Sequence, residues 1–342
     1  MPVLPVAIDV MSGDRPPREY IAGALAALEE ETELRALLVG EGALIDAARA
    51  RAPSPLRERI ETVPASQVVG MSEHPRDAVR RKKDSSMRVA VELVKSGRAS
   101  ACVSAGNTGA LTAIGHFVLK TLPGVERAAI ISAIPAAHGH TQMLDLGANT
   151  KATPEQLGQF ATMGSIISHD VYGLPAPRIG LLNIGEEDIK GHEVVQAAHA
   201  LLLASDLNYV GFVEGDDIFS GDVDVVVTDG FTGNVALKTM EGLAALIAAR
   251  MRREFDASWR DRLAGLAARR VLRRVAVSLD PRRYNGACMV GLAGIVVKSH
   301  GRADRMAFAR AVITAALAAR HGLTAHIAQA LAAPQSIGSS TP

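Results

Sequence analysis

The sequence predicts an α/β protein with a Rossmann-like, doubly wound and mainly parallel sheet. Short apolar runs, which are typical of buried parallel strands, alternate along the chain with longer stretches of helical periodicity. A polar turn that contains glycine follows most of the apolar runs. This alternation of strand, turn and helix indicates right-handed crossovers, with helices on both faces of the sheet.

In the first part of the chain, strands are predicted from runs of Val, Ile, Leu and Ala that are too short for helices and end in turn residues. Helices are predicted from longer stretches whose apolar residues recur every three or four positions. The expected strands are residues 6–8, 34–39, 60–63 and 101–103. The expected helices are residues 17–31, a stretch that ends near residue 51, residues 71–95 and residues 110–120.

Later elements follow the same pattern. Residues 128–134 and 141–144 are expected to pair antiparallel, because only a short segment with a glycine joins them. Thr153, Pro154 and Gln156 supply the N-cap, N1 and N3 residues of a helix. The other expected strands are residues 178–182, 223–227 and 295–298, and the expected helices are residues 153–168, 193–204, a long stretch after 234, and 303–320.

The chain is expected to form one α/β domain over residues 1–333, which includes an arginine-rich helical hairpin at 243–283. Residues 334–342, which are rich in Ser, Pro and Thr, are expected to be a flexible tail. A hydrophobic content of 48% with 21% charged residues excludes global disorder. The segment 99–119 lacks charged residues, but its polar side chains and glycines argue against a membrane span.

Composition also indicates the compartment. The two cysteines, Cys102 and Cys288, offer neither a disulfide framework nor the spacing of a metal site, which favours a reducing cytoplasm. The N-terminus has no basic segment and reaches Asp9 too early for a signal peptide. A formal net charge of +1 excludes nucleic-acid binding through global charge, so no nucleic-acid partner is expected.

The segment Ser104–Gly109 is the clearest of the polar turns. It follows an apolar run and precedes a helix-like stretch, so its backbone N–H groups and the helix N-terminus are suited to hold an anion. We name this turn the phosphate nest. A purely structural glycine turn is the alternative.

Five motifs together resemble those of the PlsX family of bacterial phosphate acyltransferases. They occur in the family's order and span nearly the whole chain. The motifs are Ser104–Ala110, Asp145–Asn149, Leu182–Glu187, Asp229–Asn234 and Val297–Gly301.

The resemblance implies an enzyme in which inorganic phosphate attacks the thioester of a fatty acyl chain on acyl carrier protein. The products are acyl-phosphate, which a membrane glycerol-3-phosphate acyltransferase uses in phospholipid synthesis, and free carrier protein. The family fold is similar to those of the phosphotransacetylases and the isocitrate/isopropylmalate dehydrogenases. The resemblance also implies a homodimer that associates peripherally with the membrane, with no cofactor.

Phosphate is itself the nucleophile in this reaction, so the site needs positioning groups and charge stabilisation. Lys190 and Lys298 lie at expected strand ends, where a cation holds phosphate or an oxyanion. Solvated surface lysine is the alternative for each. His300 is suited to accept a proton from phosphate or to donate one to the leaving thiol, because histidine titrates near ~6.5. Its alternative role is to fix the turn at Gly301. We expect these three residues to be catalytic.

The expected substrate-binding residues are polar side chains and glycines of the turns, together with a short basic segment. They are Asp9, Gly13, Asp14, Lys82, Lys83, Ser85, Ser104, Gly106, Asn107, Thr108, Gly109, Asp145, Asn149, Asn183, Gly185, Glu186, Asp229, Gly230 and Asn234. Turn architecture is the alternative for Asp145, Asn149, Asp229 and Asn234. A solvated face is the alternative for the basic segment, which is expected on one helix.

Glu186, Glu187 and Asp188 form an acidic cluster that resembles a divalent-metal site, with helix capping as the alternative. Since the implied transfer needs no metal, no metal site is expected. The family's opening turn usually reads Asp-Ala-Met-Gly-Gly-Asp, whereas Ser12 replaces a glycine here. A positive φ or a very close approach of phosphate is less favourable at serine.

The hairpin changes the local composition. Residues 250–283 contain eleven arginines and four acidic residues, which gives a local net charge of +7. Helical spacing places apolar residues on one side with arginines around them. Anionic lipid and the acidic carrier protein both fit such a surface, and an ordinary dimer interface is the alternative. The expected contact residues are Arg252, Arg253, Trp259, Leu263, Leu266, Arg269, Arg270 and Arg273.

Three alternative functions remain open at this point. Gly40 and Gly42 follow a strand as in a nicotinamide dehydrogenase, but Ile45 stands in place of the third glycine of that fingerprint. A membrane adaptor that uses only the hairpin would be indifferent to substitutions at Lys298, His300 or Asn107. A short-chain phosphotransacetylase would use acyl-CoA as the donor.

Overall fold

The computed structural model describes residues 5–187, 189–278 and 280–332. Asp188 and the predicted tail at 334–342 lie outside this range. The strands are β1 (Val6–Asp9), β2 (Ala36–Gly40), β3 (Ile60–Pro64), β4 (Ala101–Ser104), β5 (Ala129–Pro135), β6 (His140–Leu144), β7 (Ile179–Leu182), β8 (Tyr209–Val213), β9 (Val225–Val227), β10 (Ala287–Val290) and β11 (Ile295–Lys298).

Helices connect most of the strands. They are α1 (Pro17–Glu30), α2 (Gly42–Arg51), α3 (Ser54–Arg57), α4 (Pro75–Arg81), α5 (Ser86–Lys95), α6 (Thr108–Leu119), α7 (Pro154–Asp170), α8 (Glu193–Leu203), α9 (Gly230–Asp256), α10 (Trp259–Ser278), α11 (Arg305–Arg320) and α12 (Leu323–Ala332), with short 3-10 turns at Asp217–Phe219 and Pro281–Tyr284. No helix in the described part of the chain is both long enough and apolar enough to cross a bilayer.

The strands form one sheet with the order β3-β2-β1-β4-β11-β10-β5-β6-β9-β7-β8. β3, β2, β1, β4 and β11 are parallel to one another, and so are β6, β9, β7 and β8. Three antiparallel pairings, β11 with β10, β10 with β5 and β5 with β6, separate the two sets. The two parallel halves therefore run in opposite directions, and their carboxyl ends lie at opposite edges of the sheet.

Helices pack on both faces of this sheet, as predicted. One core cluster joins the strands to α1, α7 and α11, where the rings of Tyr20 and Phe308 lie 4.9 Å apart. The other cluster joins the strands to α5, α6 and the first turns of α9, through residues that include Met87, Leu111 and Leu237. The site described below lies at the carboxyl ends of β1, β4 and β11, between the helices that cover the two faces of the sheet.

The first and last long helices of the sheet's first half are joined by ion pairs. Arg305 of α11 lies 2.9 Å from Glu29 of α1, and Arg320 lies 3.0 Å from Glu31 at the end of α1. Both pairs are largely exposed, so their net contribution to stability is small. They nevertheless show that the two ends of the chain pack against each other.

The predicted strands and helices are mostly confirmed, including the antiparallel pair β5 and β6 and the capping box at Thr153. One prediction was wrong: residues 71–95 form two helices. α4 ends at Lys82 (φ −103°, ψ 56°), and the hydroxyl of Ser85 caps α5 by accepting the amide of Arg88 (3.4 Å). β8, β10 and α12 were not predicted.

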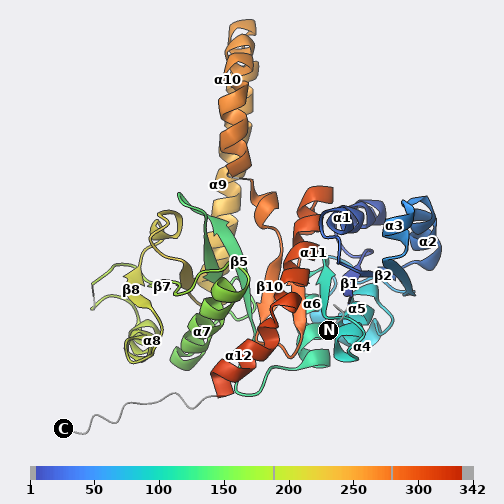
Figure 1. The fold of residues 1–342 in the computed structure, drawn as a ribbon. Helices are drawn as coiled ribbons and strands as arrows, with labels where there is room; N and C mark the ends of the chain where they lie inside the picture. The colour runs from blue at the N-terminus through green and yellow to red at the C-terminus, as the bar shows by residue number, and fades with distance from the viewer. Residues whose placement is uncertain (1–4, 188, 279, 333–342) are drawn as a thin grey trace.

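α9 and α10 form a long hairpin that projects away from the sheet (Figure 1). At its far end, Ser258 starts the second helix, because its hydroxyl accepts the amide of Asp261 (3.2 Å). A Cβ on Gly265 would lie 2.9 Å from the ring of Phe255, so the two helices pack closely at this level. The hairpin predicted at 243–283 is thus present, although its first helix begins at Gly230.

Candidate active site

Asp9 ends β1 and organises the turn that follows. The buried carboxylate accepts the amides of Met11 (3.1 Å) and Ser12 (3.2 Å) through Oδ1 and the hydroxyl of Ser104 (2.7 Å) through Oδ2. The Ser104 hydroxyl in turn accepts the amide of Gly106 (3.1 Å). Because β1 and β4 are neighbours, this chain of hydrogen bonds locks their two turns together.

Asn107 caps α6 and fixes the phosphate nest. Its Oδ1 accepts the amide of Ala110 (3.1 Å), and its Nδ2 donates to two carbonyls of residues 71–73 (2.8 and 2.9 Å). The amides of Thr108 and Gly109 open the helix and have no carbonyl partner within it. Since both residues are exposed, these N–H groups at the positive end of the helix are accessible to an anion.

Two glycines allow the turns to approach each other. Gly13 has a φ of +139°, and a Cβ at this position would lie 2.0 Å from the hydroxyl of Tyr20. A Cβ on Gly106 would lie 2.4 Å from Cε of Met87 and 2.7 Å from Cβ of Ser12. Neither position accommodates a larger residue without movement of the turns that form the nest.

Ser12 is more compatible with the opening turn than the sequence suggested. Among the residues that the structure describes, Lys120 is the one non-glycine residue with a positive φ, so Ser12 has an ordinary backbone conformation. Its side chain is completely buried, and its hydroxyl has no hydrogen-bond partner among the described atoms. The positive φ in this turn belongs to Gly13 instead.

Lys298 ends β11 beside the nest. Its ammonium group donates to the carbonyls of Ala105 (3.4 Å) and Ser299. Burial lowers the pKa of Lys298 to about 8, with a further decrease from the charge of Lys238, while Asp14 opposes the shift. A lysine with this pKa is able to exchange a proton near neutral pH.

His300 follows two residues later and is held from both sides. Its amide donates to Oδ1 of Asn285 (2.9 Å), and its Nδ1 accepts the amide of Arg302 (3.0 Å). The neutral ring therefore carries its proton on Nε2, and Nδ1 is not available as a proton acceptor. Burial lowers the pKa of His300, while the nearby Glu241 raises it.

The basic segment lies at the border of this site rather than on one helix. Lys82 donates to the carbonyl of Val68 (3.2 Å) and lies 4.0 Å from the carboxylate of Glu73, whose own carbonyl holds Asn107. The hydroxyl of Ser85 is used for capping and for a bond to the carbonyl of Lys82 (2.8 Å). Lys83 is exposed.

The motif at Asp145 forms a separate, packed junction. The buried carboxylate accepts five hydrogen bonds, from the amides of Ile130 (2.9 Å), Gly147 (3.2 Å), Ala148 (3.0 Å) and Asn149 (2.7 Å) and from the side chain of Asn149 (2.9 Å). Burial raises the pKa of Asp145. Its acceptor capacity is filled by the protein, which favours turn architecture over substrate contact.

The start of α9 docks onto this junction. Asp229 caps the helix by accepting the amide of Thr232 (2.8 Å), and the amide of Gly230 donates to the carbonyl of Asn149 (2.7 Å). The side chain of Asn234 lies against Gly147. These motif residues therefore anchor the long helix to the sheet.

The loop after β7 contains the predicted residues Asn183, Gly185, Glu186 and Lys190. The Asn183 amide closes the loop by donating to two of its carbonyls (3.0 and 3.2 Å). Lys190 is exposed and lies 4.0 Å from the carboxylate of Glu187. Because β7 runs opposite to β11, this loop leaves the sheet in the opposite direction from the turn that carries Lys298 and His300. Lys190, which was expected to be catalytic together with these two residues, thus lies on a loop at the other edge of the sheet, and its role stays a prediction.

Four side chains near the site were missed. Tyr20 donates to the carbonyl of Gly301 (2.6 Å), and Asn285 supports both Ser299 (2.8 Å) and His300. The charges of Lys238 and Glu241 on α9 act on His300. A tyrosine on a helix and a Lys–Glu pair at i,i+3 give no signal in a single sequence beyond ordinary helix patterning.

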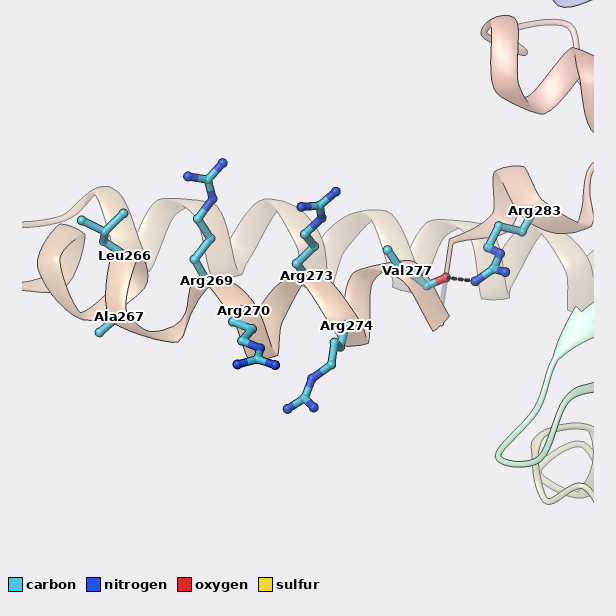
Figure 2. A pocket seen from close by; sticks show the side chains of 8 residues that line it. All are labelled: Leu266, Ala267, Arg269, Arg270, Arg273, Arg274, Val277 and Arg283. Carbon is cyan, nitrogen blue, oxygen red and sulfur yellow. Dashed lines mark hydrogen bonds between the residues drawn. The ribbon is translucent and has the colours of Figure 1, made fainter. Parts of the chain in front are cut away.

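The arginine-rich hairpin presents a groove of about 640 Å³ along α10 (Figure 2). Arg269 and Arg273 extend to one side of the helix, and Arg270 and Arg274 extend to the other (Figure 2). Trp259, Leu263 and Leu266 are 67%, 56% and 64% exposed. Exposed basic and apolar side chains thus occur together on α10, and their contact with lipid or carrier protein stays a prediction. Arg252 and Arg253 are exposed on α9.

Comparison with solved structures defines the class of fold. The chain is similar to a phosphotransacetylase from Streptococcus pyogenes (TM-score 0.60, 15% identity, 93% of this chain and 94% of that chain) and to the EutD phosphotransacetylase from Staphylococcus aureus (TM-score 0.59, 14% identity, 92% and 94%). It is also similar to a 4-hydroxythreonine-4-phosphate dehydrogenase from Burkholderia phymatum (TM-score 0.52, 16% identity, 92% and 98%). The predicted similarity to phosphotransacetylases is thus confirmed, and the fold is also shared with a dehydrogenase, although of another kind than the isocitrate and isopropylmalate dehydrogenases that were expected.

Sequence comparison is more specific. Residues 4–326 match the model of a family described as fatty acid synthesis protein. Proteins named phosphate acyltransferase from Alkalilimnicola ehrlichii and Methylococcus capsulatus are 53% and 54% identical, over 95% and 91% of this chain and the same shares of their own. The chain belongs to the phosphate acyltransferase family.

Proposed function

We propose that this protein transfers a fatty acyl group from acyl carrier protein to inorganic phosphate, and thereby supplies acyl-phosphate for phosphatidic acid synthesis. The observation that carries the proposal is the contact of Lys298 with the carbonyl of Ala105, in the same turn that bears the open amides of Thr108 and Gly109, in a chain of this family. A cation next to a helix N-terminus is suited to a phosphate dianion. The family membership favours this function over the dehydrogenase and adaptor alternatives.

The chemistry needs positioning and charge stabilisation. A phosphate oxygen attacks the thioester carbon, and the electron pair of the carbonyl moves to its oxygen. When the tetrahedral intermediate collapses, the C–S bond breaks and the carrier protein leaves as a thiolate. The proton of the monohydrogen phosphate is finally carried by the thiol. Preorganised donors lower the barrier by stabilising the charge that develops on the former carbonyl oxygen.

Lys298 and His300 have different roles in this proposal. Lys298, with a pKa of about 8, binds phosphate as a cation and relays a proton to the leaving thiolate. His300 is neutral and donates from Nε2, because its Nδ1 is occupied by the amide of Arg302. Because Nδ1 is occupied, this proposal replaces the expected proton abstraction from phosphate with hydrogen-bond donation from Nε2 to the oxyanion, a role that was not among those expected from the sequence.

The test is release of free thiol from long-chain acyl carrier protein, with and without inorganic phosphate. Phosphate-dependent release with formation of acyl-phosphate is the expected result. Acyl-CoA serves as the second donor, because it distinguishes the short-chain phosphotransacetylase alternative. Folded protein that releases thiol from neither donor when phosphate is added would contradict the proposal.

The proposal includes the setting of the enzyme. Residues 1–333 act as one catalytic domain in a cytoplasmic homodimer that contacts the membrane peripherally. The hairpin supports this contact, because its arginines fit anionic lipid and the acidic carrier protein alike. At the membrane, the glycerol-3-phosphate acyltransferase receives the acyl-phosphate before water hydrolyses it.

A further inference from the structure

α9 carries an ion pair that none of the sequence motifs emphasised. The ammonium group of Lys238 lies 2.8 Å from Oε2 of Glu241, and the two side chains are 58% and 38% exposed. An i,i+3 pair at this exposure contributes little to helix stability. Its position relative to the site is what makes it informative.

The course of α9 brings this pair to the ends of β4 and β11. The helix starts beside Asp145, directly after β9, and β9 runs opposite to β11. A helix that packs back along its own strand therefore runs toward the edge at which β11 ends. Leu237 and Met240 pack against the same core cluster as Ala287, and Ala287 is the ladder partner of Lys298.

The electrostatics agree with this placement. The charge of Lys238 lowers the pKa of both Lys298 and His300, and the charge of Glu241 raises the pKa of His300. Because charge effects weaken with distance, they support a position of the Lys238–Glu241 pair near Lys298 and His300, which the packing of α9 indicates independently. Asp9 and Asp14 are the other charged groups that act on Lys298.

Two ammonium groups that face each other repel, and the repulsion is stronger where one of them is largely removed from water. Glu241 neutralises Lys238 at present, but Lys298 has only carbonyl partners. A dianion between the two lysines would change repulsion into attraction on both sides. The amides of Thr108 and Gly109 belong to the same turn as Ala105 and are further donors for such a dianion.

We propose that Lys238 is a second phosphate-binding lysine, which exchanges Glu241 for the phosphate dianion and holds it against Lys298 and the nest. This inference rests on the proposed function, since it assigns the phosphate of that reaction to a position. Glu241 is a positioning residue, because it pairs with Lys238 when no phosphate is bound and competes with phosphate for the Lys238 ammonium group.

The test is the kinetics of K238Q and E241Q, with K95Q as the matched control on the exposed end of α5. K238Q is expected to raise the KM for phosphate at least tenfold and to leave the KM for acyl carrier protein within twofold. E241Q is expected to lower the KM for phosphate or leave it unchanged, since Lys238 is then free for the anion. K95Q is expected to behave as the wild type.

A merely structural ion pair predicts a different result. Both variants would then lose thermal stability alike, and neither would affect the KM for phosphate selectively, which would overturn the inference. Calorimetric binding of inorganic phosphate to the wild type and to K238Q separates this question from turnover. Weaker binding by K238Q supports the phosphate role even if the acyl donor is misassigned, whereas equal binding overturns it.

Discussion

At the scale of a single residue, burial of Lys298 disfavours the charged form that its proposed role in phosphate binding requires. Its ammonium group is held between two carbonyls at the end of β11, and burial lowers its pKa to about 8. The unfolded chain binds this proton more readily than the folded chain, so the charged lysine costs folding free energy. The same shift allows it to exchange a proton near physiological pH.

This conflict predicts the pH dependence of activity. The charged form is present below the folded pKa and is lost above it, so turnover at saturating phosphate is expected to fall as pH rises past about 8. K298R keeps its charge at all accessible pH values and is expected to lose this decline, at a lower maximal rate. A wild-type profile that stays flat to pH 10 would contradict the role of Lys298.

Stability should change in the opposite sense. Between about pH 8 and 10.5, the ordinary pKa of lysine, the unfolded chain binds more protons than the folded chain, so the free energy of unfolding of the wild type rises with pH across this window. K298M lacks this rise, and at pH 7 it is expected to be more stable by roughly 1–3 kcal/mol, because one pKa unit corresponds to about 1.4 kcal/mol. Urea unfolding at pH 7 and pH 9.5 measures both effects, with K95M as the control.

Residues of the site differ in how far the sequence could predict them. Asn107 and His300 lie in motifs that follow strands, and Lys298 is the last residue of β11. Asn107 belongs to the nest and Lys298 contacts Ala105 within it, whereas the catalytic roles of Lys298 and His300 stay predictions. Lys190 also lies in such a motif, but its strand runs the other way. Lys238 acts on the site from a helix whose direction depends on long-range pairing, which a single sequence does not reveal.

At the scale of an element, α6 depends on one amide side chain. Asn107 caps the helix through Oδ1 and fixes residues 71–73 through Nδ2. It thus combines a helix start with the closure of a loop around the nest. The turn at Lys82 to Ser85, which separates α4 from α5, also shapes the nest, because it places Met87 against Gly106.

These two functions of Asn107 are separable by substitution. N107S keeps a capping oxygen but loses the bonds to residues 71–73, whereas N107A loses both. N107A is expected to destabilise the protein by about 1–2 kcal/mol, the usual cost of a lost cap, and both variants are expected to raise the KM for phosphate. T153A, which removes the cap of the remote helix α7, is the control for stability without a change in KM. Equal phosphate kinetics in N107S and wild type would show that the loop contact is dispensable.

The elements were largely predictable because periodicity is a local property. The break inside residues 71–95 was missed because Lys82 to Asp84 are polar residues that also suit an exposed helix face. β10 was missed because it directly follows the arginine-rich stretch, although it pairs with β11, the next strand of the chain, as well as with the distant β5. The opposite directions of the two halves depend on the pairing of β10 with β5, which joins segments far apart in sequence and leaves no local signal.

At the scale of the whole molecule, the hairpin extends the protein beyond its sheet (Figure 1). Its arginines extend to both sides of α10 (Figure 2), and Trp259, Leu263 and Leu266 on the same helix are exposed. This combination suits reversible attachment to an anionic surface better than insertion into it. Under the proposed function, we expect the hairpin to be the part of the enzyme that contacts the membrane.

Charge reversal tests this surface. The double variant R269E/R273E is expected to bind vesicles that contain anionic phospholipid at least tenfold more weakly, since each basic residue near such a surface contributes about 1 kcal/mol. Wild-type binding should weaken as salt is added. R18E/R51E, a double reversal on exposed residues of α1 and α2, is the control. Vesicle binding by R269E/R273E that equals that of the wild type, measured by co-sedimentation, would exclude lipid as the partner of these arginines.

The strand order also dictates when the protein is able to fold during synthesis. β10 and β11 are the last two strands to leave the ribosome. They lie between β4 and β5 and so join the two halves of the sheet. Until residue 298 has emerged, β4 presents an unpaired edge, and β5 lacks the neighbour that links it to the first half. A nascent chain of this protein thus holds two unfinished sheets with open edges, which makes it dependent on protection from aggregation until translation is almost complete.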